Sequence, residues 1–269
     1  MSYPDRFRLI LIVTLLILPV LIRAQEKSRV DLEKAIQNPI ANLVSFPFQN
    51  NTDFDIGTHN RTKNTLNIQP VLPFALGKNV NLITRTIIPI ITQPVGADES
   101  TTGLSDINLS LMFSPANPGA IVWGIGPVFG IPAASDDILG SGKWTTGPCM
   151  VILTQPEGWT FGMLAQNIWS FAGKEDRDEV NFFFSQVFIT KKLPAGWYIN
   201  SSPIITSNWK ASSGNQWTIP LGMGTGKLFR LGKLPVNFQA GYYYYIEKPE
   251  GAAKWMLRAQ LTFILPKFY

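Results

Sequence analysis

The 269-residue chain has a single cysteine and a single histidine, and both scarcities limit its chemistry. Cys149 has no partner for an internal disulfide, and one Cys and one His far apart in sequence do not make a zinc site. His59 is the only candidate base for a serine hydrolase, yet no compact strand motif pairs it with a serine. We therefore expect no enzyme activity, no metal site and no cofactor.

Charge and long apolar segments are also sparse. The chain has 23 Lys and Arg against 18 Asp and Glu, a net charge of +5 without a basic cluster, which argues against nucleic acid as a partner. Beyond residue 24 no segment has about 20 uninterrupted apolar residues, so no membrane-spanning helix is expected. The glycines of segment 222–227 do not form a phosphate loop, because Leu228 stands where Ser or Thr would bind magnesium.

An export signal is predicted at the N-terminus. Arg6 and Arg8 precede an apolar run at 9–22, which is too short to span a bilayer but typical of a signal peptide. We expect residues 1–24 to be removed after Ala24, which takes away three arginines and one aspartate and lowers the net charge from +5 to +3. No cysteine follows that site, so a lipid anchor is not expected.

Alternation of apolar and polar side chains dominates the remainder. Twelve segments are predicted as strands, most of them about 10 to 13 residues long, where soluble sheets average about 5–6 and tilted membrane strands need about 9–11. They are 53–58, 65–75, 80–91, 104–114, 120–131, 143–154, 159–171, 180–191, 197–209, 216–229, 235–247 and 253–265. The last one is followed by Phe268 and Tyr269, a terminal aromatic pair of the kind that closes an outer-membrane barrel.

Connections and tryptophans support the same fold class. Short turns, such as 115–119, alternate with longer polar loops, such as 92–103 and 132–142, as in bacterial outer-membrane barrels. Seven of the eight tryptophans lie near expected strand ends, where aromatic girdles meet the lipid–water interface. The prediction is an all-β, transmembrane, antiparallel up-and-down barrel of about twelve strands; a soluble sandwich is the rival.

The segment before the barrel is predicted to be different. Residues 30–43 show the one helical period of apolar residues, with Asp31 as a candidate start and Pro39 as a stop or kink, and 45–51 looks irregular. We assign 25–52 to an N-terminal plug and 53–269 to the barrel. Gly124, Gly126 and Gly130 share one face of a strand and are expected to make room for this plug.

Three charged residues occupy polar-face positions within expected strands: Arg85, Asp106 and Arg258. A charge facing lipid there would cost about 2–4 kcal/mol, so all three are expected to face the lumen. They could form a constriction that tunes selectivity, or an internal salt-bridge network that only fills the barrel. The sequence does not separate these alternatives.

Several blocks of the chain resemble a known family: 41–51, 66–73, 81–89, 103–108, 137–144, 167–173 and 201–206. They are similar to the outer-membrane transporter family named for the meta-cleavage pathway of phenol degradation, some members of which carry the label "neuromedin U". The resemblance covers nearly all of the chain after residue 24. It implies a Gram-negative outer-membrane barrel related to channels for hydrophobic compounds, and it supplies no catalytic residues.

The expected function is passive passage of a small molecule, hydrophobic or aromatic ones included, through the bacterial outer membrane. Expected partners are outer-membrane lipid, the barrel-assembly machinery through the C-terminal strand, and an unidentified solute. Two alternatives stay open: a structural or surface-binding barrel with a filled lumen, and an outer-membrane lipid hydrolase that would depend on His59.

Overall fold

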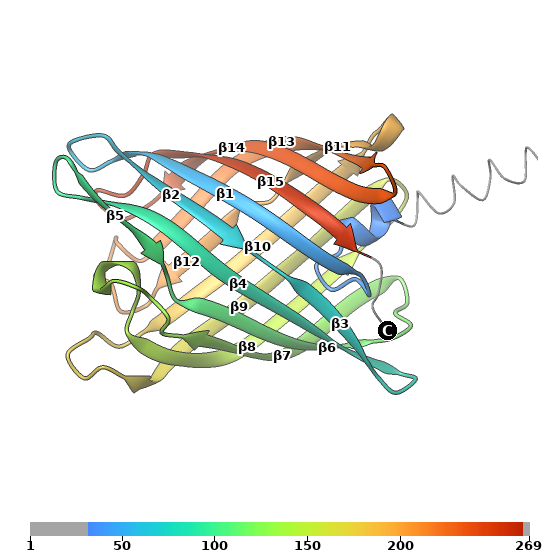
Figure 1. The fold of residues 1–269 in the computed structure, drawn as a ribbon, viewed down its shortest axis with the longest axis horizontal. Helices are drawn as coiled ribbons and strands as arrows, with labels where there is room; N and C mark the ends of the chain where they lie inside the picture. Colours follow the sequence, from blue (N-terminus) through green and yellow to red (C-terminus); the bar gives the residue numbers. More distant parts are fainter. Residues whose placement is uncertain (1–31, 266–269) are drawn as a thin grey trace, which may run out of the picture.

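Fifteen strands form one closed antiparallel sheet in the computed structural model, which describes residues 32–265 (Figure 1). Two short 3₁₀ helices, η1 (Asp137–Leu139) and η2 (Pro194–Gly196), lie in connections. The strands are β1 (Val44–Ile56), β2 (Arg61–Ile68), β3 (Val71–Leu76), β4 (Val80–Val95), β5 (Glu99–Leu104), β6 (Ile107–Pro115), β7 (Ile121–Ile131), β8 (Lys143–Thr154), β9 (Trp159–Gly173), β10 (Asn181–Lys192), β11 (Trp197–Ser201), β12 (Ile204–Asn208), β13 (Trp217–Leu231), β14 (Leu234–Glu247) and β15 (Trp255–Leu265).

Three barrel strands are each split in two, so the sheet is a barrel of twelve strands, as predicted. The splits separate β2 from β3, β5 from β6 and β11 from β12. Pro70 and Pro203 lie in two of these splits, where a residue without an N–H cannot donate to the ladder. Both halves of each split strand pair with a common neighbour, so the wall stays continuous.

The first strand begins earlier than expected, and this corrects two predictions. Residues 45–51 are not irregular, and the plug does not extend to residue 52, because β1 starts at Val44. β1 pairs with β15 from Val44 opposite Leu265 to Phe54 opposite Trp255, which closes the barrel. Asn and Pro have low β-propensity, but pairing with strands on both sides outweighs that local preference.

The two kinds of connection lie at opposite ends of the barrel, as expected for antiparallel strands (Figure 1). One predicted loop is wrong, however. Residues 92–103 are mostly strand, because β4 continues to Val95 and β5 begins at Glu99, with paired residues up to the turn. This hairpin therefore projects as ordered sheet at the long-loop end.

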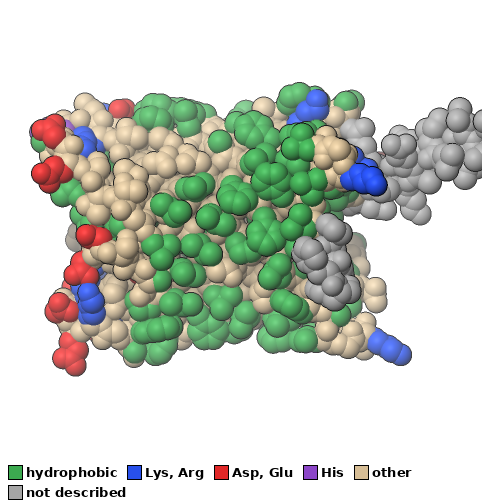
Figure 2. Space-filling view, in the orientation of Figure 1, with side chains coloured by type: hydrophobic (Ala, Val, Ile, Leu, Met, Phe, Trp, Pro, Cys, Tyr) green, Lys and Arg blue, Asp and Glu red, His purple; other side chains and the backbone are tan. Residues whose placement is uncertain are grey.

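The outer surface carries a broad apolar band between two charged rims (Figure 2). Large apolar side chains are exposed within it, among them Leu221 and Met223 at 63% and 66%. Acidic side chains gather at the rim with the longer loops, and the opposite rim shows lysine and arginine (Figure 2). An exposed apolar band of this kind suits contact with lipid rather than water.

The described chain enters the barrel as a short helix. Residues 32–36 are helical, and the helix ends before Pro39, as predicted. No helix in the described part of the chain is long and apolar enough to cross a membrane. The expected signal peptide at 1–24, the start at Asp31 and the terminal Phe268 and Tyr269 lie outside the described residues.

Candidate functional site: the lumen and its N-terminal segment

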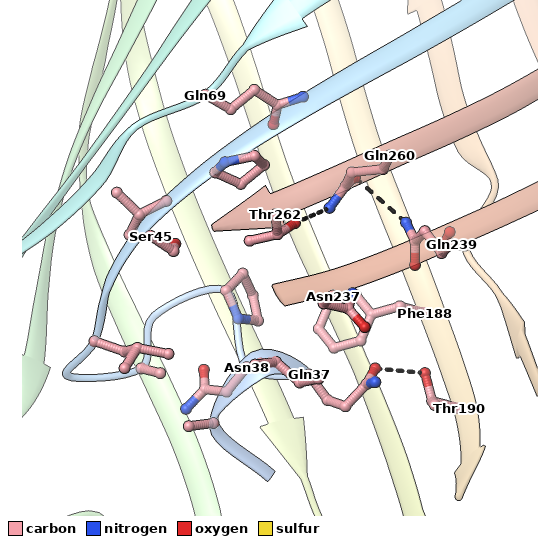
Figure 3. A pocket seen from close by; sticks show the side chains of 18 of the residues that line it. Gln37, Asn38, Ser45, Gln69, Phe188, Thr190, Asn237, Gln239, Gln260 and Thr262 are labelled. Atoms are coloured by element: carbon pink, nitrogen blue, oxygen red, sulfur yellow. Dashed lines mark hydrogen bonds between the residues drawn. The ribbon is translucent and has the colours of Figure 1, made fainter. Parts of the chain in front are cut away.

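The N-terminal segment, defined here as residues 32–43, is held inside the barrel by hydrogen bonds to the wall and by apolar packing. Gln155 Nε2 donates to the carbonyl oxygen of Lys34 at 2.9 Å. Thr190 Oγ1 donates to Gln37 Oε1 at 3.0 Å (Figure 3). Asn38 Oδ1 accepts the backbone N–H of Ile40 at 2.9 Å, which fixes the turn after the helix. The segment is thus tied to two different parts of the wall while its own backbone turns back toward β1.

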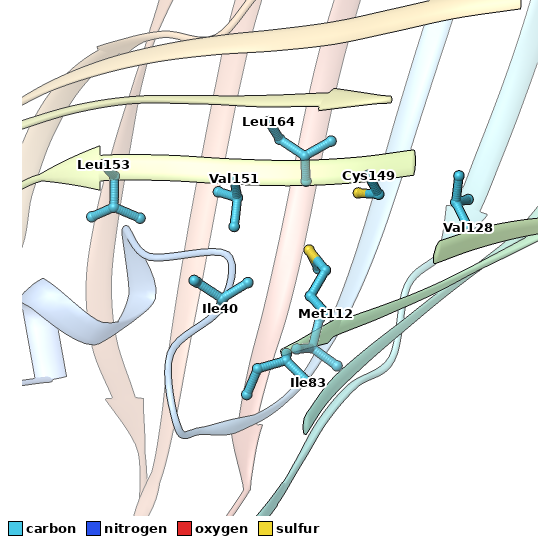
Figure 4. Close-up of a cluster of buried hydrophobic side chains, with 9 residues drawn as sticks. Ile40, Ile83, Met112, Val128, Cys149, Val151, Leu153 and Leu164 are labelled. Carbon is cyan, nitrogen blue, oxygen red and sulfur yellow. The ribbon is translucent and has the colours of Figure 1, made fainter. Parts of the chain in front are cut away.

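Ile40 is the apolar anchor of this segment. Its side chain is 4% exposed and lies among residues from β4, β6 and β8 (Figure 4). The cluster around it consists of Val71, Ile83, Met112, Val128, Cys149, Val151, Leu153 and Leu164. One side of the lumen is therefore an apolar strip, and Ile40 fills part of it.

The opposite side of the lumen is a wall of amides and hydroxyls. Gln239 Nε2 donates to Gln260 Oε1 at 3.3 Å, and Gln260 Nε2 donates to Thr262 Oγ1 at 3.0 Å (Figure 3). On β11, Tyr198 OH donates to Asn237 Oδ1 at 3.0 Å. These bonds join inward-facing, uncharged side chains of neighbouring strands into a hydrogen-bonded network.

A cavity of about 160 Å³ lies between this polar wall and the N-terminal segment. Apolar residues contribute at its edges, including Phe188 and Ile264. Its polar lining is made of Gln37, Asn38, Ser45, Gln49, Gln69, Arg85, Gln186, Thr190, Tyr198, Asn200, Ser202, Asn237, Gln239, Gln260 and Thr262. Residues 35–43 form one side of the cavity, so their position controls its size.

Arg85 is the one predicted lumen charge that reaches this cavity. It lies on β4 and lines the cavity, and its Nη2 donates to Gln69 Oε1 at 2.6 Å. Gln69 lies in the split between β2 and β3. Its side chain is therefore not bound to the inward–outward alternation of a regular strand, and it contacts Arg85. The partner is a neutral amide, so the positive charge of Arg85 is not neutralised by it.

Arg258 lies elsewhere in the lumen and braces the wall. Its Nη1 donates to the carbonyl oxygen of Ser202 at 2.7 Å, and its Nε donates to Asn51 Oδ1 at 3.0 Å. The guanidinium also lies 4.8 Å from the centroid of the Tyr243 ring. Ser202 lies in the split between β11 and β12, where Pro203 interrupts the ladder. Arg258 therefore satisfies a carbonyl that the neighbouring strand leaves free.

Asp106 anchors a loop rather than lining the cavity. Its Oδ2 accepts the backbone N–H of Ser141 at 2.6 Å and the hydroxyl of Ser141 at 2.7 Å. The loop 132–142 is held further by Arg177, whose Nη2 donates to the carbonyl oxygens of Asp137 and Gly140. The three predicted charges thus do not form one constriction, and no ion pair links them among residues 32–265.

The same loop carries an ion pair outside the barrel wall. Lys174 Nζ lies 2.6 Å from Asp137 Oδ1, and both side chains are more than half exposed. This hydrogen bond and the charge of Lys174 hold the pKa of Asp137 below its ordinary value. Lys210 likewise lowers the pKa of Glu179.

The three glycines of β7 meet different neighbours. A Cβ on Gly124 would lie 3.2 Å from Ile40 Cδ1, so this glycine gives room to the N-terminal segment. At Gly126 the nearest atom would be the Leu111 carbonyl oxygen, and at Gly130 it would be the Thr145 hydroxyl. At Gly126 and Gly130 a side chain would therefore clash with neighbouring barrel strands and not with the N-terminal segment.

The lone histidine lies away from this lumen. His59 is exposed in the turn between β1 and β2, at the end with the longer loops. Within residues 32–265 no group of three or more His, Cys, Asp or Glu side chains could hold a metal ion. His59 therefore belongs to no such cluster in the described part of the chain.

Two charged lumen residues were missed from the sequence. Asp53 and Lys63 are opposite each other on β1 and β2, and Asp53 Oδ1 accepts the Tyr245 hydroxyl at 2.6 Å. Taking 45–51 as irregular hid the alternation of β1 and with it the inward position of Asp53. The register Gln49, Asn51, Asp53 would have revealed it, because inward residues of a barrel strand alternate with outward ones.

The comparisons with known proteins show the fold but no family. The chain matches no family model and no curated protein. It is similar in structure to the COG4313 outer membrane channel from Pseudomonas putida F1, with a TM-score of 0.61 at 13% identity over 83% of this chain and 96% of that one. The fold is that of an outer-membrane β-barrel.

A second solved structure agrees. The NanC porin superposes with a TM-score of 0.52 at 7% identity, over 83% of this chain and 100% of the porin. Both similarities are to outer-membrane barrels of comparable extent, so the soluble sandwich considered from the sequence is excluded by the closed sheet and by these likenesses. The resemblance to the phenol meta-pathway transporter family stays a prediction.

Proposed function

We propose that the protein is an outer-membrane channel for small solutes, closed in this structure by its N-terminal segment. The end with the short turns and both described termini faces the periplasm, and the longer loops face outward. After export and signal cleavage, the C-terminal strand β15, which Phe268 and Tyr269 follow in the sequence, serves barrel assembly, and the apolar band contacts membrane lipid. The COG4313 channel, which is similar in fold, supports a transport role.

One observation carries this proposal: the lumen has an apolar side and a polar side, with residues 32–43 between them. A barrel with a purely structural role needs no separate plug, because large side chains of its own strands could fill the lumen. Here a separate segment fills the space, and the wall holds it through the Gln155 and Thr190 hydrogen bonds together with the packing of Ile40. Such a segment can be displaced without breaking the barrel ladder.

The two-sided lumen also indicates what passes through it. A solute with an apolar body can follow the strip around Val151 and Leu164 while its polar groups face the amides of β14 and β15. A purely hydrophilic solute would gain nothing from the apolar strip. Small amphipathic or aromatic molecules therefore fit best.

The filled, structural barrel is the alternative, and solute flux decides between the two. Liposomes containing the protein, or a variant lacking residues 25–41, would be tested for release of trapped small amphipathic molecules. The deletion stops at residue 41 because β1 begins at Val44, so the wall is left intact. We expect release through the deletion variant at a rate well above that of empty liposomes.

Absence of release in both proteins, with barrel folding verified by a heat-dependent shift in gel mobility, would refute the channel and favour the filled barrel. Release that is equal in the complete protein and the deletion variant would keep the channel but remove the closing role of residues 32–43.

A further inference from the structure

Two lysine–tryptophan pairs lie on the outer face of the barrel, at the end with the short turns. Lys191 Nζ lies 4.6 Å from the centroid of the Trp159 ring, and Lys227 Nζ lies 4.8 Å from the centroid of the Trp197 ring. Each lysine is the register partner of its tryptophan on the neighbouring strand. Trp159 and Trp197 are the first residues of β9 and β11, and tryptophan at strand ends marks the lipid–water interface. Both amines therefore lie at this interface.

Neither amine has an acidic partner in the part of the chain that the structure describes. The ion pairs in the outer loops lie at the opposite end of the barrel and include neither Lys191 nor Lys227. The tryptophan rings hold the two amines in place through the attraction of a cation for an aromatic face. An ammonium group has three N–H donors and no acceptor. Each lysine therefore keeps its charge and its donors for an anionic group.

The two pairs are neighbours on the sheet. β11 pairs with β10 on one side, where Lys191 lies opposite Ile199, and with β13 on the other, where Lys227 lies opposite Trp197. One strand thus separates the two lysines, which corresponds to about 10 Å across the sheet. This spacing is close to the Debye length of about 8–10 Å in physiological salt, so an anion beside one lysine is also attracted by the other. The two lysines therefore form one basic patch.

An apolar groove lies beside this patch. It has a volume of about 640 Å³ and crosses the outer face from β11 to β1. Its floor consists of small side chains, because Thr225, Ala240 and Ala259 are register partners on β13, β14 and β15. The larger, exposed Met223 and Leu257 border it on the side away from the short turns. A long apolar chain can therefore lie across these strands.

The strand register connects the groove with the lysines. Lys191 lies opposite Ile199, which lines the groove. Lys227 follows Thr225 by two residues, so both side chains are on the same face of β13. The groove therefore extends from the basic patch into the apolar band, and a ligand that fills both must have a charged head and an apolar tail.

We propose that this surface binds an anionic phospholipid, with its phosphate at the Lys227 amine and one acyl chain in the groove over Thr225, Ala240 and Ala259. Lys191 supplies the second positive charge of the patch. The patch selects the headgroup by charge, because the phosphate of a zwitterionic lipid is already offset by the ammonium of the same lipid. The site lies on the outer face, so it goes beyond the proposed function and needs no open lumen.

The test measures lipid binding to the complete folded protein in detergent by native mass spectrometry. The probes are phosphatidylglycerol and phosphatidylethanolamine with identical acyl chains, and glycerol 3-phosphate as a charged head without chains. A lysine near an anionic headgroup changes the affinity by about fivefold, so we expect phosphatidylglycerol to bind about tenfold or more tightly than phosphatidylethanolamine. Glycerol 3-phosphate should not displace the bound lipid, because it cannot fill the groove.

Charge variants test the headgroup site. Lys227→Gln should lower the preference for phosphatidylglycerol about fivefold, and Lys191→Gln should lower it by a similar or smaller factor. The double variant should bind the two lipids equally. Lys78→Gln is the matched control, because Lys78 lies in the turn between β3 and β4 at the same end of the barrel but outside the patch. It removes the same charge and should leave the preference unchanged.

Groove variants test the acyl-chain site. Ala259→Phe places a large ring on the floor of the groove and should weaken both lipids by the same factor, so the preference for phosphatidylglycerol remains. Ala172→Phe is the matched control, because Ala172 is exposed near the end of β9 and does not line the groove. It should bind both lipids as the unmodified protein does.

Equal binding of the two lipids to the unmodified protein would overturn the proposal. An equal loss of preference in Lys78→Gln and Lys227→Gln would also overturn it, because net charge alone would then attract the lipid. Displacement by glycerol 3-phosphate, or unchanged binding in Ala259→Phe, would exclude the groove and with it a lipid ligand. Folding of each variant is verified by the heat-dependent shift in gel mobility. Lipid binding is measured apart from solute flux, so failure of this site and failure of the channel are distinguishable.

Discussion

Ile40→Ala should open the lumen without harming the barrel. Ile40 is 4% exposed and is the described N-terminal segment's contribution to the apolar cluster. Truncation of a buried isoleucine to alanine typically costs about 2–5 kcal/mol. Here that cost falls on the docking of residues 32–43, because the wall residues keep their own ladder. The ratio of docked to undocked segment should fall by roughly 30-fold or more.

Single-channel recording in planar bilayers measures this change. The complete mature protein should be closed most of the time, and Ile40→Ala should raise the open probability while leaving the conductance of the open state unchanged. Ile152→Ala is the matched control, because Ile152 lies next to Val151 on β8 but points outward and is 41% exposed. It should behave as the unmodified protein.

The reasoning would be refuted if Ile40→Ala had the open probability of the complete protein while a variant lacking residues 25–41 conducted freely. In that case the polar ties of the segment, at Gln155 and Thr190, would hold it in place and the apolar anchor would be dispensable.

Three further predictions follow from individual contacts. Gly124→Leu should displace Ile40, whose Cδ1 would lie 3.2 Å from a Cβ at this glycine, and increase current, whereas Gly119→Leu, with no atom within 4 Å, should not; equal currents would contradict the contact. Arg258→Met should remove charge-assisted bonds worth about 1.5–3 kcal/mol each and lower the urea midpoint of unfolding more than Arg61→Met, and an unchanged midpoint would exclude the bracing role. Lys174 lowers the pKa of Asp137 from its ordinary value of 3.8, so the carboxylate is ionised and the ion pair is fully formed above pH 3.8. The ion pair is lost as the pH falls through the lowered pKa, where the carboxylate becomes protonated. Hydrogen exchange in the loop 132–142 should then rise below about pH 4 in the complete protein, and Lys174→Met should lack this pH dependence.

The sequence predicted the barrel because its signals are local. Alternation in 255–265 places Met256 and Arg258 inward and Leu257 outward, and the structure buries the first two and exposes the third. Strand length and the tryptophans near strand ends are local as well. Such signals do not depend on which strands are neighbours, so they could be recognised without the fold.

The start of β1 could not be recognised in this way. Asn50 and Thr52 face outward, opposite Ala259 and Leu257, so the strand is polar on both faces. Asn64 Nδ2 donates to both of them, which offsets the cost of placing polar groups toward lipid. Only the neighbouring strand supplies that partner, and the sequence does not show which strand it is.

The roles of Arg85, Asp106 and Arg258 could not be predicted from the sequence either, because they depend on partners that are distant in the chain. Arg258 donates to a carbonyl 56 positions away in sequence, and Asp106 accepts from Ser141, 35 positions away. Both residues face inward, yet each completes a local break in the wall or a loop. The cavity around Arg85 depends on strands from both halves of the chain, and its neutral amides carry no motif.

The most direct test of the central claim is single-channel conductance of the complete mature protein beside a variant lacking residues 25–41. The structure predicts little current through the complete protein and frequent, larger openings through the variant, since the deletion removes the segment that fills the lumen and spares β1. No current through the folded variant would contradict the channel, and full current through the complete protein would contradict closure by the N-terminal segment.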